Sequence, residues 1–166
     1  MLSTKHFFLS LCVAATAVLA VVMPLDAQQP QPAPPADPAV PALADIMSAT
    51  QLRHLKLAYS GKVMNWTLAG YELGLIQQSF DAAGRHYAVF KDIPLAELVK
   101  TESGPPLADL RRAIDAKSSD AFAKAFVRLT QACNRCHQAA GVGFIVIRIP
   151  TASPFSNQLF PPTETR

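Results

Sequence analysis

The sequence predicts an all-α protein, with an antiparallel four-helix bundle over residues 42–141 and an irregular C-terminal extension over residues 142–166. Three observations lead to this prediction. Apolar residues recur three and four positions apart in four separate segments, which is the spacing of amphipathic helices. A long connection is expected between the second and third segments, and the sequence contains no internal repeat. Four such helices in succession bury their apolar faces best as a bundle.

The first helix is predicted from about Leu43 to Tyr59, with Gly61 ending it. Its apolar stripe includes Met47 and, near the middle, His54. The stripe is narrow, so every residue on it is expected to face the interior of the bundle.

The second helix is predicted from about Trp66 to Ala83, with Asn65 as its N-cap. Gly70 and Gly74 lie one turn apart on it, and this pair favours the close approach of another helix. Residues 84–104 then form the long connection, with a short helical turn expected around residues 95–100.

The third helix is expected to begin at Pro106, because proline suits the first turn of a helix. The fourth, capped by Ser118 or Ser119, is predicted from Asp120 to about Ala140. Large apolar residues of the second and fourth helices should meet in one core: Trp66, Leu73, Ile76, Phe80, Phe122, Phe126 and Leu129.

Residues 1–27 have the layout of a secretory signal peptide that is cleaved after Ala27. Lys5 precedes an uncharged apolar run, and Pro24 breaks it. An uncleaved membrane anchor is the alternative, since the run is just long enough to span a bilayer. Cleavage predicts an exported protein in the periplasm. Residues 28–41 are rich in proline and predict an extended linker ahead of residue 42.

The formal net charge is +3, and no run of basic residues is present, so nucleic acid is not an expected partner. The only two cysteines outside the predicted signal peptide lie in the sequence "CNRCH", Cys133 to His137. Cys-x-x-Cys-His is the attachment pattern of c-type haem. On a helix the two thiols share one face and can add to two vinyl groups on one porphyrin edge. His137 lies along that face and can offer a ring nitrogen to iron.

We therefore predict one covalent haem c, attached at Cys133 and Cys136 and ligated by His137. A zinc site is an alternative, but it needs four ligands, and only His54 and His86 are further nitrogen donors. A plain disulfide is the other alternative, although closing so small a loop removes little chain entropy.

A haem motif on the last helix of an exported four-helix bundle resembles the class II c-type cytochromes, the cytochrome c′ family. The resemblance rests on "CNRCH" and the helix count and covers about residues 42–141. It implies that Cys133 and Cys136 form the thioethers, that His137 is the proximal ligand, and that a residue of the first helix faces the other side of the iron. It also implies a homodimer that pairs through the first two helices.

The sequence departs from this family in two places. Residues 142–166 continue beyond the usual end, and their apolar run predicts that they pack on the bundle or on the haem edge, with a docking segment for a partner as the alternative. On the distal side, His54 is a candidate second metal ligand and Met47 a weaker one. A histidine on an apolar face is also often a hydrogen-bonded core residue.

These residues predict either electron transfer to a periplasmic redox partner protein or the binding of a small gas such as NO or CO. Two strong axial ligands favour electron transfer, and an open sixth position favours gas binding. The sequence shows no hydrolytic or group-transfer site, so we do not expect an enzyme. A peroxidase-like activity stays open, with His54 as a distal base. The alternative from another class is a non-catalytic interaction module with a structural Cys133–Cys136 disulfide or metal site.

Overall fold

The computed structural model describes residues 40–162. The predicted signal peptide, nearly all of the predicted linker and residues 163–166 lie outside this range, so the expectations about them are untested. Within the described range, no helix combines the length and the apolarity that a bilayer crossing requires.

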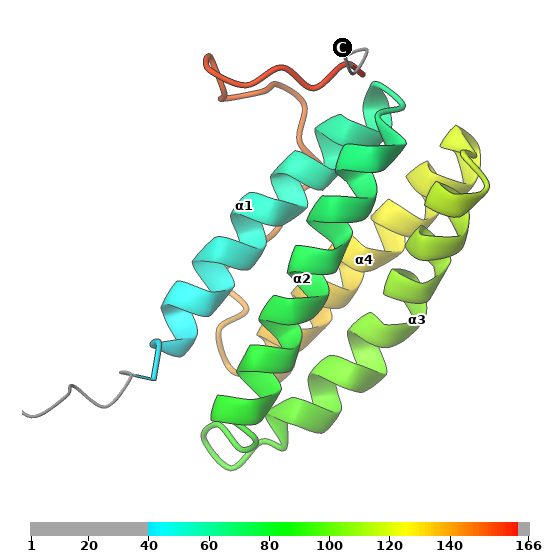
Figure 1. The fold of residues 1–166 in the computed structure, drawn as a ribbon. Helices are drawn as coiled ribbons and strands as arrows, with labels where there is room; N and C mark the ends of the chain where they lie inside the picture. The colour runs from blue at the N-terminus through cyan, green and yellow to red at the C-terminus, as the bar shows by residue number, and fades with distance from the viewer. Residues whose placement is uncertain (1–39, 163–166) are drawn as a thin grey trace, which may run out of the picture. The chain divides into compact units, whose positions relative to one another are not determined.

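Four helices make up the fold: α1 (Leu43–Lys62), α2 (Trp66–His86), α3 (Leu95–Asp115) and α4 (Ser119–Ala139). Each helix packs along the one that follows it in the sequence, whereas α1 and α4 touch over a much shorter stretch (Figure 1). The prediction of an all-α antiparallel four-helix bundle is therefore confirmed.

The turn between α1 and α2 is tight and lies close to its predicted place. Asn65 caps α2, and its side-chain oxygen accepts a hydrogen bond from the Leu68 amide at 3.1 Å. The prediction that Gly61 ends α1 is wrong, because Gly61 lies within the helix. A Cβ atom at Gly61 would overlap the ring of Phe122, so the absence of a side chain lets α4 come close to α1.

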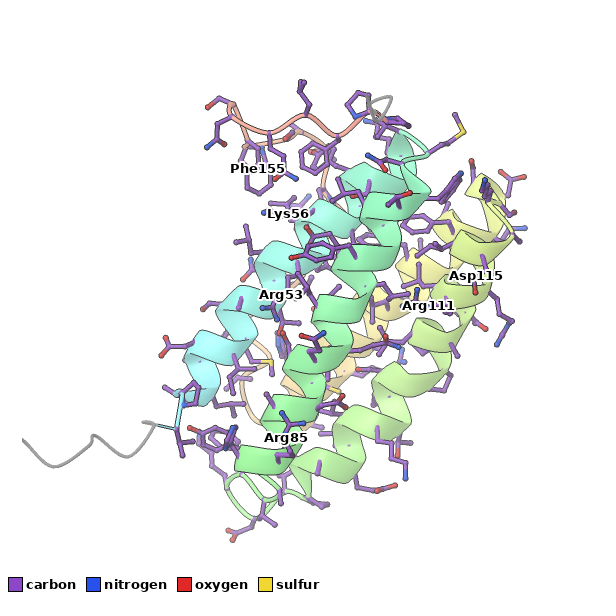
Figure 2. The ribbon with its side chains drawn as sticks, in the orientation of Figure 1. Arg53, Lys56, Arg85, Arg111, Asp115 and Phe155 are labelled. Atoms are coloured by element: carbon purple, nitrogen blue, oxygen red, sulfur yellow. The ribbon has the colours of Figure 1, made fainter. Side chains whose placement is uncertain are left out.

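Close packing at Gly74 was wrongly predicted, because a Cβ atom there would meet no atom within 4 Å. Hydrogen bonds from Arg53 join α1 to α2 instead. Its guanidinium donates a hydrogen bond to the Leu75 carbonyl at 2.9 Å, from α1 across to α2 (Figure 2). A second hydrogen bond joins it to the Ser79 hydroxyl.

The predicted start of α3 at Pro106 is wrong. The helix begins at Leu95 and continues through Pro105 and Pro106, although neither proline can donate a backbone hydrogen bond. An apolar stripe explains this, because buried residues recur at helical spacing on both sides of the prolines: Leu95, Val99, Leu107, Leu110 and Ile114. Burial of this stripe outweighs the two lost hydrogen bonds.

The connection between α2 and α3 is accordingly shorter than expected. It contains a tight turn in which Phe90 and Ile93 exchange backbone hydrogen bonds at 2.9 and 3.0 Å. The two central residues, Lys91 and Asp92, both have positive φ angles of 47° and 65°. This is the geometry of a type I′ turn.

The buried core is concentrated where α1 ends, α2 begins and α4 begins. Of the seven predicted core residues, five are buried, and Trp66 and Phe80 are partly buried and pack against the others. Aromatic rings dominate this region: Phe122 stacks on Phe126 at a centroid distance of 6.0 Å, and Trp66 meets Phe122 edge-on at the same distance.

Residues 142–162, which we call the C-terminal strap, contain no helix or strand and run back along the bundle from the end of α4 to the α1–α2 turn (Figure 1). Ile147 and Phe160 are its buried anchors. The Asn65 amide donates to the Phe160 carbonyl at 2.9 Å. The Lys56 ammonium lies 5.5 Å from the centre of the Phe155 ring, a cation–π contact (Figure 2).

Candidate functional site

A cavity of about 530 Å³ lies at the end of the bundle away from the aromatic core. Its walls come from the start of α1, the end of α2, the start of α3, the end of α4 and the C-terminal strap. Apolar side chains form most of its surface. The five residues that the sequence singled out for a haem line it: Met47, His54, Cys133, Cys136 and His137.

Cys133 and Cys136 are free, partly buried thiols on α4. Burial is the main reason that the pKa of Cys133 is raised to about 12, and the neighbouring Cys136 raises it further. Burial likewise raises the pKa of Cys136 to about 11, with a smaller contribution from Glu102. Both groups are therefore neutral thiols near pH 7. Neutral thiols are compatible with an apolar wall.

His137 lies in the last turn of α4, and its ring is held from one side. Nδ1 is 2.7 Å from the backbone carbonyl of Ile145 in the C-terminal strap. A carbonyl oxygen only accepts, so Nδ1 carries the ring proton and donates it. In a neutral imidazole, Nε2 then keeps its lone pair and is free to bind a metal.

His54 is buried on α1 and is held from the opposite helix. Its Nε2 lies 2.9 Å from the Thr130 hydroxyl on α4. That hydroxyl donates to the Phe126 carbonyl at 3.0 Å, so Nε2 is the donor to the hydroxyl oxygen. The ring also packs on Phe126, with 4.4 Å between centroids. Burial lowers the pKa of His54 to about 4, which keeps the imidazole neutral at pH 7.

The two histidines thus border the same cavity with different nitrogens committed. His137 donates from Nδ1 and has Nε2 available, whereas His54 donates from Nε2 and has Nδ1 available. Met47 is half-buried on α1, on the N-terminal side of His54. His86, the other possible nitrogen donor, does not line the cavity: it is the exposed last residue of α2 and not part of the predicted connection.

Sequence reasoning missed three groups that hold this site. Thr130 could have been found, because it lies three residues before Cys133 and seven before His137, on the same helix face. Asn134 lies between the two cysteines, at a position that the haem motif leaves free. The Ile145 carbonyl is a backbone atom of an irregular segment and carries no signal in the sequence.

No three His, Cys, Asp or Glu side chains in residues 40–162 are grouped as a metal-ion site. Comparison with protein-family models, with curated proteins and with solved structures finds no significant match for this chain.

Proposed function

We propose that this chain is an exported mono-haem c-type cytochrome, of the cytochrome c′ kind, which binds a small diatomic gas such as NO or CO. One observation carries the proposal: Cys133, Cys136 and His137, from a haem-attachment motif, line one apolar cavity together with His54. Export belongs to the proposal because covalent haem is attached outside the cytoplasm.

The cavity and its donor groups fit a haem better than they fit zinc. A volume of about 530 Å³ is within the usual range of about 300–1,000 Å³ for small-molecule sites, and its walls are mostly apolar. Structural zinc needs four converging donors, and the described residues bring no three together.

Each residue of the motif has a role in this proposal. The Cys133 and Cys136 thiols would hold the haem by adding across one vinyl group each, with sulfur bonding to one carbon and the thiol proton passing to the other. Nε2 of His137 would ligate the metal, because Nδ1 is committed to the Ile145 carbonyl. When bound, the haem supplies an iron centre that exchanges one electron and accepts axial ligands.

A second hollow, of about 650 Å³, lies between α2 and α3. It adjoins the cavity, and the two share the lining residues Phe80, Val99 and Ser103. Arg85 and Lys100 line this hollow, together with Asp81. Cations beside an apolar cavity suit the two carboxylates of a porphyrin, since charged hydrogen bonds to carboxylate are the strong ones. We assign these two cations to the propionate side of the haem.

The state of His54 favours gas binding over electron transfer. Ligation through Nε2 would cost the hydrogen bond to Thr130 and would leave a buried hydroxyl with one partner fewer. A His54 that keeps this hydrogen bond would not ligate the iron and would leave room for a small ligand. Electron transfer is the second candidate, because Nδ1 of His54 keeps a lone pair and makes no hydrogen bond within residues 40–162.

The test is the visible spectrum of the purified ferric and ferrous protein, with and without CO, from a host that attaches haem. We expect a mass increase of one haem over the mature chain and rapid CO binding to high-spin ferrous protein. His54→Ala should change the CO rate only modestly, whereas Cys133→Ala should weaken haem retention.

Two other results would overturn parts of this proposal. A six-coordinate low-spin spectrum that becomes high-spin in His54→Ala assigns His54 as the distal ligand and favours electron transfer. A colourless protein that is correctly exported by such a host rules out haem and leaves the interaction module with a Cys133–Cys136 disulfide or metal site.

A further inference from the structure

The hydrogen bond that fixes His137 comes from outside the helical bundle. Its acceptor, the Ile145 carbonyl, belongs to the C-terminal strap, which has no helix or strand of its own. Such a segment cannot hold one carbonyl in register with a side chain unless other contacts fix it. Ile145 itself is 43% exposed, so its own side chain is a weak anchor.

Asn134 supplies the missing contact through both ends of its carboxamide. Its Nδ2 donates to the Ile147 carbonyl at 2.9 Å, and its Oδ1 accepts from the Ile147 amide at 2.8 Å. The side chain thus pairs with one strap residue as a neighbouring strand would. Ile147 is also buried, with 8% of its surface exposed, and it lines the cavity.

The geometry connects this pair directly to His137. Asn134 lies three residues before His137 on α4, and Ile147 lies two residues after Ile145 on the strap. A backbone bond from the Val142 amide to the His137 carbonyl, at 2.9 Å, fixes the other side of the turn. The Ile145 carbonyl is therefore held between two anchored points.

We propose that Asn134 is a positioning residue for His137, and this inference rests on the proposed haem function. By holding Ile147, Asn134 keeps the Ile145 carbonyl on Nδ1 of His137. That bond fixes the ring orientation and the tautomer, with Nε2 toward the cavity. It also makes the imidazole a stronger electron donor, as outer hydrogen bonds do for metal-bound histidine.

The position of Asn134 within the motif supports a specific role. Its neighbour Arg135 points the other way, to α3, where it pairs with Glu102 at 2.6 Å. The two residues between the cysteines thus reach two different parts of the molecule. A carboxamide carries its donor and its acceptor on separate atoms, so it can bond the carbonyl and the amide of one backbone residue at the same time.

Two variants disrupt the hydrogen bonds between Asn134 and Ile147, one at each residue. Asn134→Ala removes the carboxamide, and Ile147→Pro removes the amide hydrogen that the carboxamide accepts. Gln131→Ala, at an exposed position on α4, is the matched control. We measure the reduction potential of the haem-loaded protein and, by NMR, the exchange rates of the His137 Nδ1 proton and of the Ile147 amide in the wild type, the control and Asn134→Ala.

In Asn134→Ala we expect both protons to exchange about tenfold faster than in the wild type, because the variant loses the net stabilisation of about one hydrogen bond. The potential should rise, because a weaker histidine donor stabilises the ferric state less. Ile147→Pro should raise it similarly, and the double variant should add little, since both changes remove the same contact. Gln131→Ala should match the wild type in every measurement.

The inference is overturned if Asn134→Ala leaves the exchange of the His137 Nδ1 proton and the potential equal to those of Gln131→Ala. Additive effects of the two variants would also contradict it. If the chain carries no haem, the proposed function fails separately, and the exchange of both protons in the haem-free chain still decides whether Asn134 holds His137.

Discussion

The two ends of the bundle use the same four helices and differ in how they are filled. At one end, Trp66, Phe122 and Phe126 pack ring against ring over buried leucines. At the other end, the same helices surround a cavity of about 530 Å³ that carries the thiols and imidazoles. We call these the closed end and the hollow end.

This difference separates stability from chemistry along the helix axes. A core packed to normal density stabilises a fold through burial, whereas side chains that line a void lose contacts on one side. The closed end therefore holds the helices together, and the hollow end can leave space for a ligand. His54 lies at the junction, with its ring against Phe126 of the core and its edge on the cavity.

The largest expected effect comes from comparing two leucines of α3. Leu110 is fully buried at the closed end, and Leu95 lines the cavity at the hollow end. Leu110→Ala should lower the free energy of unfolding by about 4–5 kcal/mol, and Leu95→Ala by only about 2–3 kcal/mol, the two ends of the range for such changes. Urea unfolding of the haem-free chain measures both.

Under the proposed function, the haem-loaded protein supplies the control for this comparison. The proposed haem, by filling the cavity, would give Leu95 the contacts it lacks, so the cost of Leu95→Ala should increase while that of Leu110→Ala stays the same. Equal costs for the two variants in the haem-free chain would remove the distinction between a closed and a hollow end.

The second prediction concerns His54, at the junction of the two ends, and the pH dependence of the free energy of unfolding. Burial lowers the pKa of His54 from 6.5 to about 4, so between these values the unfolded chain binds a proton that the folded chain does not. Stability should therefore fall as the pH drops from about 6.5 and level off below about 4. The full loss corresponds to about 3 kcal/mol.

His54→Gln keeps a group that can donate to Thr130 but does not titrate in this window. Its unfolding free energy should fall less steeply with acid than that of the wild type, when the haem-free proteins are compared by urea unfolding from pH 7 to pH 4. Parallel pH curves for the two proteins would show that His54 is not buried as a neutral imidazole.

The sequence predicted the four helices because their periodicity is strong, and it failed where two signals competed. Pro105 and Pro106 suggested the start of a helix, whereas the apolar stripe from Leu95 to Ile114 runs through them. Burial of that stripe is a tertiary effect, and local propensity cannot weigh it. The same competition explains Gly61, which serves packing against Phe122 and not the end of a helix.

The candidate site was predictable to the extent that its residues share helix faces. Cys133, Cys136 and His137 follow from one motif, and His54 from one stripe. The groups that orient the histidines, such as the Ile145 carbonyl, depend on how an irregular segment returns to the bundle. No local pattern encodes that path.

The smallest effect compares two glycines, and it tests how tightly the closed end is packed. A Cβ atom at Gly61 would overlap the Phe122 ring, whereas one at Gly74 would meet nothing within 4 Å. Gly61→Ala should therefore destabilise the protein by about 1–3 kcal/mol, as overpacking of a core does. Gly74→Ala should stabilise it by about 0.5–1 kcal/mol, because alanine loses less entropy than glycine in a helix. Thermal unfolding followed by circular dichroism measures both changes. If Gly61→Ala were as harmless as Gly74→Ala, the Phe122 ring would be free to move, and the closed end would not be packed to core density.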